Sequence, residues 1–290
     1  MRFIVIGDIM VDRTIYGEVH KISPEAPVPV ITHSYITEVL GGAANVARNI
    51  EAIGHEVIMG GYIGEIAQKL FQKTSINIDS AIEVEQDNIK TRFVDIKTGY
   101  HLLRYDNETK TKLYGPLTSG PWIHLKWHQK ILPYDGVIIS DYHKGSLDSN
   151  VAEIIQYANE ANVPIFVDTR RSNIDIFKGA SWLMPNLKEL NAILEEYNLI
   201  EPADIIKFLG LQGIIITMSE DGMELQMLNP KVRLRTAATN SHIVDVTGAG
   251  DTALASFAIA IAEGKKPVQA LRIANKNAGI VCMKRGTATV

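Results

Sequence analysis

The octapeptide at residues 245–252 reads Asp245-Val246-Thr247-Gly248-Ala249-Gly250-Asp251-Thr252 and leads directly into the apolar run Ala253–Ala262. Its two glycines allow backbone N–H groups to converge, and the helix that follows presents its positive end there, which predicts an anion site. The carboxylate of Asp251 would repel a bound anion unless it acted on a second reactant. A base that accepts a proton from an attacking hydroxyl, beside amides that neutralise a transferring phosphoryl group, accounts for both features. We therefore predict phosphoryl transfer at this turn.

Two other interpretations of the octapeptide stay open. It could be only a helix start with a flexible turn and an acidic first-turn residue. Gly248, Gly250 and Ala253 also fit the G-x-G-x-x-G/A dinucleotide fingerprint. That fingerprint belongs after the first strand of a βαβ unit, whereas this turn lies late in the chain and residues 266–284 read as another helix. No Walker sequence G-x-x-x-x-G-K-[ST] occurs, so phosphoryl transfer without a Walker loop is the leading prediction.

The composition predicts a globular domain and argues against binding to polyanions or membranes. The chain has 290 residues, is 46% hydrophobic and carries a formal net charge of −4. This length suits one large domain over residues 1–290, and the negative charge argues against a general nucleic-acid or membrane-surface binder. One cysteine excludes a disulfide framework. Because no leader and no apolar run of roughly 18 residues is found, we expect a cytoplasmic protein.

Short runs rich in Val and Ile alternate with longer helical stretches, which predicts βαβ units in an α/β fold with a mostly parallel sheet. The expected strands are Phe3–Gly7, Val57–Gly61, Gly136–Ser140, Pro164–Asp168, Trp182–Met184 and Gly213–Thr217. The expected helices are Ala43–Ile53, Ser149–Ala161, Leu187–Tyr197, Pro202–Leu209, Ala249–Glu263 and Pro267–Lys284.

Two regions depart from this alternation. Residues 16–35 contain Val28-Pro29-Val30-Ile31, and residues 90–105 alternate apolar and polar side chains. Both predict antiparallel strands outside the main sheet, because prolines are confined to edge strands or isolated ribbons. A small antiparallel β lid formed by about residues 12–36 and 88–106 would exclude water from phosphoryl transfer. An additional sheet without that role is the alternative.

Glycines and polar residues near the N-terminus form a candidate ligand site. Gly41 and Gly42 open a predicted helix and allow a ligand to approach the backbone, and Asn45 can donate and accept hydrogen bonds toward hydroxyls. A tight connection between elements is the alternative. Asp8 and Asp12 follow the first strand, where ligands bind in open α/β sheets. We favour Asp12 as the residue that binds a hydroxylated substrate, because the chain leaves the sheet for the lid there, and expect Asp8 to stabilise the turn.

Asn186 and Glu189 follow the strand expected at Trp182–Met184. An amide at a helix start with an acidic residue three positions later is typical of a capping box. The same pair at the carboxyl end of a strand can also organise Mg²⁺ and its waters beside nucleotide phosphates. The sequence leaves both interpretations open.

Four basic residues lie on the expected lid, namely Arg13, Lys90, Arg92 and Arg104. Such residues can simply be solvated, but several that converge on a pocket would bind a phosphate that the substrate already carries. Arg104 is the first candidate, because it ends an alternating strand that can point it across the lid. The eight histidines show no metal-ligand spacing.

Taken together, the chain resembles the ribokinase (PfkB-type) carbohydrate kinases, and within them the heptose-7-phosphate kinases. The general family motifs are the glycine pair with Asn45 and the turn Asp245–Asp251. The more specific segments are Gly7–Arg13, Ile22-Ser23-Pro24-Glu25-Ala26-Pro27-Val28-Pro29-Val30, Gly41–Ala47, Ser140-Asp141-Tyr142-His143-Lys144-Gly145, Pro185–Glu189, Ser219–Met223 and Gly286–Val290. The resemblance covers essentially the whole chain.

This resemblance implies a ribokinase-like three-layer sandwich and an enzyme that depends on ATP and Mg²⁺. Asp251 would be the base, and the amides of Gly248, Ala249 and Gly250 would form the anion hole. Asn186 and Glu189 would lie by the phosphates, with Glu189 toward the metal. The nucleotide would be framed by Thr217, Ser219, Gly222 and Asn275. The sugar would be held by Asp12, Gly41, Gly42 and Asn45.

The resemblance also implies a substrate, D-glycero-D-manno-heptose 7-phosphate phosphorylated at O1 on the way to ADP-heptose, and a homodimer formed through the lid strands. One departure from the usual pattern is Asp168-Thr169-Arg170-Arg171, which stands where Asp-Pro-Lys-Gly is typical. The alternatives are a kinase for another sugar, of ribokinase or fructokinase type, and a nucleotide- or sugar-binding protein without turnover. Intact Asp251 and Gly248–Gly250 argue against the latter.

Overall fold

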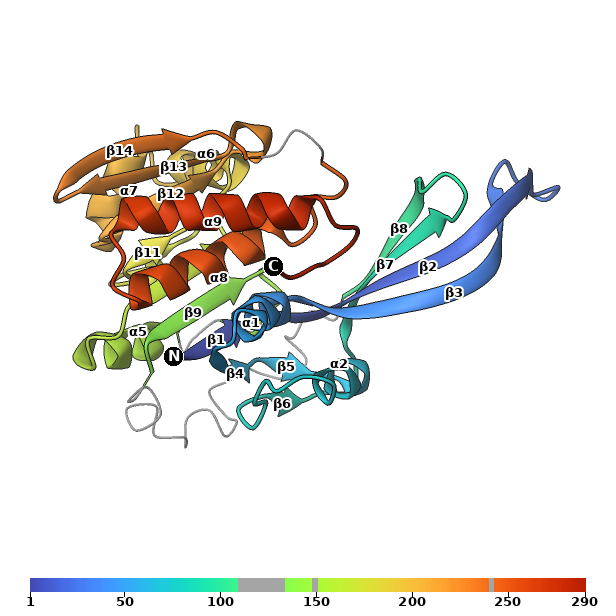
Figure 1. The fold of residues 1–290 in the computed structure, drawn as a ribbon, viewed down its shortest axis with the longest axis horizontal. Coiled ribbons are helices and arrows are strands. Elements are labelled where there is room, and N and C mark those ends of the chain that lie inside the picture. Colours follow the sequence, from blue (N-terminus) through green and yellow to red (C-terminus); the bar gives the residue numbers. More distant parts are fainter. Residues whose placement is uncertain (109–133, 148–150, 240–242) are drawn as a thin grey trace.

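A computed structural model describes residues 1–108, 134–147, 151–239 and 243–290 of the chain. Its centre is an eight-stranded sheet (Figure 1) with the strand order β14-β13-β12-β11-β10-β9-β1-β4. The strands are β1 (Arg2–Gly7), β4 (Glu56–Gly60), β9 (Gly136–Asp141), β10 (Ile165–Thr169), β11 (Trp182–Leu183), β12 (Gly213–Thr217), β13 (Met223–Leu228) and β14 (Lys231–Thr236). Only β13 runs against the others, so the sheet is mostly parallel, as predicted.

Helices cover both faces of this sheet. Along β1, Phe3 and Val5 face one hydrophobic cluster while Ile4 and Ile6 face the other, because successive side chains of a strand point to opposite faces. The first cluster is completed by α1 (Ala43–Ala52), α8 (Ala249–Ala262) and α9 (Pro267–Cys282). The second is completed by α5 (Val151–Glu160), α6 (Leu187–Glu196) and α7 (Pro202–Leu209). The predicted three-layer α/β architecture is confirmed.

A second, four-stranded sheet extends away from this body (Figure 1) and has the order β3-β2-β7-β8. Its strands are β2 (Ile9–Ile22), β3 (Pro29–Gly42), β7 (Asn88–Asp95) and β8 (His101–Asn107). We call it the small sheet. It consists of two antiparallel hairpins whose inner strands, β2 and β7, pair in parallel. The proline at the start of β3 lies on an edge strand, where it removes no internal hydrogen bond.

The boundaries of the predicted elements agree with the structure to within a few residues, and α7 and β12 agree at both ends. Residues 149–150 of the expected helix Ser149–Ala161 lie outside the described residues. The sequence reasoning missed the β13–β14 hairpin, the helix α2 (Glu65–Phe71) and the pair β5 (Tyr62–Ile63) and β6 (Ile82–Glu83). The small sheet also begins earlier than expected, since β2 starts at Ile9. Among the described helices, none has the length and apolar character to cross a bilayer.

Candidate active site

A cavity of about 300 Å³ lies where the carboxyl ends of the central strands meet the base of the small sheet. The structure brings eleven residues predicted from the sequence to its wall, and these are Asp12, Gly42, Lys90, Arg92, Arg104, Asn186, Glu189, Thr217, Gly248, Gly250 and Asp251. Seven further residues line it, and these are Tyr142, Asp168, Arg170, Met184, Val246, Thr247 and Thr287. Residues from opposite ends of the chain thus share one cavity, at the edge of the sheet where α/β proteins bind ligands.

Asp251 lies in the first turn of α8 and is only 5% exposed. Both of its carboxylate oxygens are held, because Asn45 Nδ2 donates to Oδ2 at 2.8 Å and the Tyr142 hydroxyl donates to Oδ1 at 2.8 Å. Burial raises the pKa of Asp251 to about 6, although the two donors oppose this shift. A carboxylate with this pKa is mostly ionised at neutral pH and is a stronger base than an exposed aspartate.

The turn before α8 presents backbone N–H groups to the cavity. Gly248 adopts the left-handed conformation with φ 82°, and a Cβ there would lie 2.7 Å from Asn45 Nδ2, so the fold itself requires glycine. Ala249 N–H reaches Val246 O at 3.2 Å, whereas the N–H groups of Gly248 and Gly250 find no acceptor among the described residues. Free amides at the positive end of a helix can hold an anion.

At Gly250, unlike at Gly248, no contact within the described protein requires a glycine. A Cβ at Gly250 would meet no atom within 4 Å, and the residue lines the cavity. Space of this kind allows another molecule to approach the backbone closely. The geometry therefore permits the predicted anion hole at Gly248–Gly250.

Gly41, Gly42 and Asn45 pack closely against aspartates at and next to the cavity. A Cβ at Gly41 would lie 2.3 Å from Asp12 Oδ2, and one at Gly42, where φ is 59°, would lie 2.5 Å from Asp8 O. Asn45 is completely buried and touches Asp251, and its Oδ1 has no hydrogen-bond partner in the described part of the chain. Gly41 and Asn45 do not line the cavity. Gly41 therefore leaves room for the Asp12 carboxylate, and Asn45 holds the Asp251 carboxylate in place.

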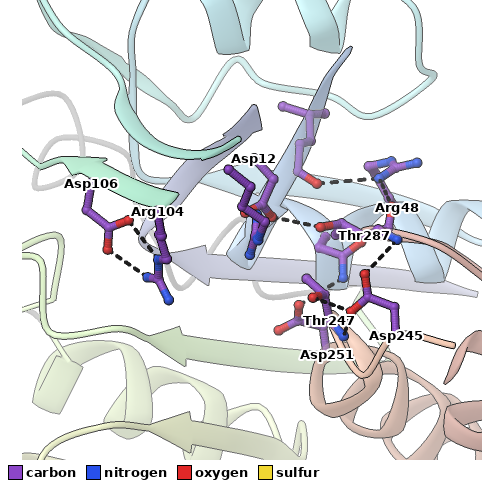
Figure 2. Close-up of polar contacts among 12 residues, drawn as sticks. Asp12, Arg48, Arg104, Asp106, Asp245, Thr247, Asp251 and Thr287 are labelled. Atoms are coloured by element: carbon purple, nitrogen blue, oxygen red, sulfur yellow. Dashed lines mark hydrogen bonds and ion pairs between the residues drawn. The ribbon is translucent and has the colours of Figure 1, made fainter. Parts of the chain in front are cut away.

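Asp12 connects the small sheet with the end of the chain. Its Oδ1 accepts a hydrogen bond from Arg92 Nη1 at 2.8 Å, and its Oδ2 accepts one from the Thr287 hydroxyl at 2.8 Å (Figure 2). Asp8, in contrast, accepts backbone N–H bonds from Tyr142, Lys144 and Ser146. Asp8 therefore stabilises a turn, as expected, while Asp12 faces the cavity.

The four basic residues of the small sheet do not all converge. Arg13 forms an ion pair with Glu38 at 2.6 Å and does not line the cavity, since it follows Asp12 in a strand and points to the other face. Arg104 lines the cavity, but Asp106 occupies its guanidinium through bonds of 2.8 and 2.6 Å (Figure 2). Lys90 lies 4.8 Å from the centre of the Tyr142 ring. Burial and the charge of Arg170 lower the pKa of Lys90 to about 8.

Asn186 and Glu189 form the capping box that the sequence suggested. Asn186 Oδ1 accepts the Glu189 N–H at 2.9 Å, and Glu189 Oε2 accepts the Asn186 N–H at 2.8 Å. Both residues also line the cavity, next to Asp168. Burial and the charges of Glu189 and Asp251 raise the pKa of Asp168 well above its usual value. Carboxylates are therefore crowded on this wall, which is unfavourable without a cation.

Only one of the four residues expected to frame a nucleotide, Thr217, lines the cavity. Ser219 and Gly222 belong to the turn between β12 and β13, where a Cβ at Gly222 would lie 2.0 Å from Thr236 O. Asn275 donates to Ala237 O at 2.7 Å and so holds the segment after β14. These three residues have roles within the fold, and the cavity wall does not include them.

Of the seven cavity residues that were not predicted as site residues, three make contacts that bear on the site: Tyr142, Arg170 and Thr287. Tyr142 follows β9 and Arg170 follows β10, so their position at the carboxyl ends of parallel strands was the available signal. The Arg170 guanidinium carbon lies 4.2 Å from the centre of the Tyr142 ring. Thr287 is distant from Asp12 in sequence, and no local pattern predicts their contact.

Known proteins resemble the whole of this chain. The pfkB family carbohydrate kinase pattern matches residues 2–290. The bifunctional protein HldE of Photorhabdus laumondii is 38% identical over 298 residues, covering 99% of this chain and 61% of that protein. HldE of Haemophilus ducreyi is 35% identical over 300 residues, covering 100% of this chain and 62% of that protein. The chain thus spans about three fifths of the length of these relatives.

Solved structures share the fold. Arabidopsis thaliana ribokinase, complexed with ribose and ATP, aligns with a TM-score of 0.75 and 19% identity over 98% of this chain and 93% of that one. Phosphofructokinase-2 from Escherichia coli aligns with a TM-score of 0.76 and 14% identity over 99% of this chain and 94% of that one. The ribokinase-like fold and the carbohydrate kinase class predicted from the sequence are thereby confirmed, and the chain belongs to the pfkB family of carbohydrate kinases.

Proposed function

We propose that this chain transfers the γ-phosphoryl group of ATP to O1 of a sugar that already carries a phosphate, with D-glycero-D-manno-heptose 7-phosphate as the first candidate. The observation that carries the proposal is the arrangement at α8. An ionised, buried Asp251 lies beside the free N–H groups of Gly248 and Gly250, and all three line the cavity that Asp12 enters. A base and an anion hole in one cavity suit phosphoryl transfer to a hydroxyl.

The residues divide the chemistry between them. Asp12 orients the sugar by accepting a hydroxyl hydrogen bond, and Asp251 accepts the proton of the attacking hydroxyl. That oxygen forms the new bond to phosphorus while the bond from phosphorus to the bridging oxygen breaks and ADP leaves. The N–H groups at Gly248–Gly250 stabilise the charge on the transferring phosphoryl oxygens, which is where preorganised donors contribute most.

The wall around Glu189 fits a hydrated Mg²⁺ ion. In the described residues, no group of three or more His, Cys, Asp or Glu side chains is arranged around a metal position. Mg²⁺ on nucleotide phosphates needs only one or two carboxylates, with waters completing its octahedron. Glu189 and Asp168 supply these carboxylates, and the Asp168 carboxylate accepts no hydrogen bond from the described residues. When bound there, the ion would neutralise phosphate charge.

Three observations support the substrate assignment. The first is the set of segments resembling heptose-7-phosphate kinases, and the second is that relatives named HldE match the whole of this chain. The third is the cationic wall at Lys90 and Arg92. In this proposal the small sheet acts as a lid over the acceptor, with Arg104 on its rim. We further infer a cytoplasmic homodimer formed through the small sheet, because Tyr35, Ile36 and Leu103 expose 45%, 50% and 59% of their surface there. Sedimentation of the chain and of an Ile36→Glu variant tests this dimer.

A coupled ADP-release assay over a panel of sugars and sugar phosphates tests the function. We expect the highest kcat/KM with heptose 7-phosphates and dependence on Mg²⁺, with NMR locating the new phosphate on O1. Equal or better turnover of ribose or fructose would reassign the chain to a general sugar kinase. Binding of nucleotide and sugar without any ADP release would instead indicate a protein that has lost turnover.

A further inference from the structure

A second cavity, of about 440 Å³, lies between the small sheet and the segment that follows α9. The phosphoryl transfer proposed at Asp251 does not require this second cavity. Three residues, Asp12, Arg92 and Thr287, line both this cavity and the one at Asp251. The two cavities therefore adjoin at Asp12.

The acidic side chains of the second cavity already have donors. Asp12 accepts bonds from Arg92 and Thr287, as described above. Asp245 Oδ1 accepts from the N–H and the hydroxyl of Thr247 at 2.9 and 2.7 Å, and its Oδ2 accepts from Gly286 N–H at 2.9 Å (Figure 2). Asp12 is thus paired with the cation Arg92, whereas both oxygens of Asp245 are occupied by neutral donors.

The arginine on the opposite wall, Arg285, has no acidic partner in the parts of the chain that the structure describes. Its guanidinium packs against Gly99 in the turn between β7 and β8, with Nη2 and Nη1 at 3.4 and 3.7 Å from where a Cβ would be. Its two successors are anchored, Gly286 to Asp245 and Thr287 to Asp12. The cavity therefore presents an arginine on a fixed backbone, and Arg92 also lines it.

We propose that Arg285, together with Arg92, binds the phosphate that the acceptor sugar already carries; the proposal rests on the function proposed above. Arginine matches the geometry of phosphate oxygens with paired, charge-assisted hydrogen bonds. Arg104 is less suited to this role than the sequence suggested, because Asp106 already occupies its guanidinium. The second cavity thus decides whether a sugar phosphate or an unmodified sugar is accepted.

The test compares three variants of the full chain: Arg285→Gln, Arg104→Gln and, as a matched control, Arg272→Gln. Arg272 is exposed on α9 and lines neither cavity. Removing a charge-assisted hydrogen bond to a phosphate raises KM about 10- to 100-fold. We expect this increase for the sugar phosphate in Arg285→Gln, with KM for ATP unchanged, and no change in Arg272→Gln. Calorimetric titration of the sugar phosphate should show the same loss of affinity without any turnover.

The outcomes separate this inference from the proposed function. A wild-type chain that binds and phosphorylates unmodified sugars as well as their phosphates overturns both. If the wild type prefers the phosphates, but Arg285→Gln retains its affinity or Arg104→Gln loses more, the assignment of Arg285 is overturned alone. Thermal melts control for folding, and Arg285→Lys, which keeps the charge without the paired donors, should recover part of the affinity.

Discussion

Asp251 and Arg285 lie at the two ends of the proposed acceptor path, and their surroundings are opposite in character. Asp251 is 5% exposed, bonded through both oxygens, and placed by α1, β9 and α8, which pack into the main body. Arg285 is exposed and has no acidic partner within the described residues, on a segment after the last helix. We call these the transfer end and the acceptor end.

The different surroundings of Asp251 and Arg285 indicate which part of the reaction each end controls. Proton removal and charge stabilisation require groups held in place before the reaction, because reorganisation would add to the barrier. Only the packed main body holds such groups in place. Recognition of the far end of a sugar needs complementary charge, which an exposed strand or segment can supply. Changes at the transfer end should therefore affect kcat, and changes at the acceptor end should affect KM for the sugar.

The largest expected effect is that of Asp251→Asn. The amide cannot accept the hydroxyl proton, so kcat should fall by about 10²- to 10⁴-fold. Nucleotide binding, measured by calorimetry, and the melting temperature should change little. A variant that keeps more than about a third of the wild-type kcat would contradict the assignment of Asp251 as the base.

Gly250→Ala tests the anion hole at the same end. A methyl group there meets no protein atom within 4 Å, so the variant should fold normally. The methyl would occupy space toward the transferring phosphoryl group and displace it from the backbone N–H groups, which themselves remain. We expect kcat to fall on the order of 10²-fold, as when an oxyanion donor is out of reach. The melting curve is the control. Wild-type kcat in a well-folded variant would place the phosphoryl group elsewhere.

Tyr142→Phe should move the pH dependence of the reaction. Because Asp251 must be ionised and burial raises its pKa to about 6, wild-type kcat should fall as the pH drops through 6. The Tyr142 hydroxyl stabilises the ionised form, so its removal should raise that pKa by about one unit. The acid limb of the pH–rate profile would then shift upward, with a loss of about twofold at pH 7. If the acid limb of the profile did not shift, the only remaining role of Tyr142 would be its packing against Arg170.

The smallest effect on kcat is expected for Glu189→Gln, provided that Mg²⁺ is saturating. Glutamine can replace glutamate in a capping box, so the helix start of α6 should persist. Loss of a carboxylate near the metal should raise the Mg²⁺ concentration for half-maximal rate by about tenfold. The Mg²⁺ titration and the melting curve measure the two roles separately. An unchanged titration would leave Glu189 with the capping role alone.

Local patterns were sufficient for most of the fold. Alternating apolar runs and helical stretches predicted the parallel strands and α7 and α8, because both faces of a parallel sheet are covered and its strands are almost wholly apolar. Gly248 marked the turn before α8, because its left-handed backbone conformation favours glycine. The β13–β14 hairpin was missed although residues 231–236 alternate in exposure, since charged side chains dominate that run.

Contacts between distant segments could not be predicted in this way. Nothing near Asn45 in the sequence shows that it donates to Asp251, and nothing near Thr287 shows that it donates to Asp12. The four basic residues of the small sheet were expected to converge, with Arg104 as the first candidate, but strand alternation and the carboxylates of Glu38 and Asp106 separated them. Sequence spacing specifies which residues share an element, because helix and strand periods are local. Which charges meet depends on how whole elements pack, so Arg285 became a candidate only when the end of the chain was seen beside the small sheet.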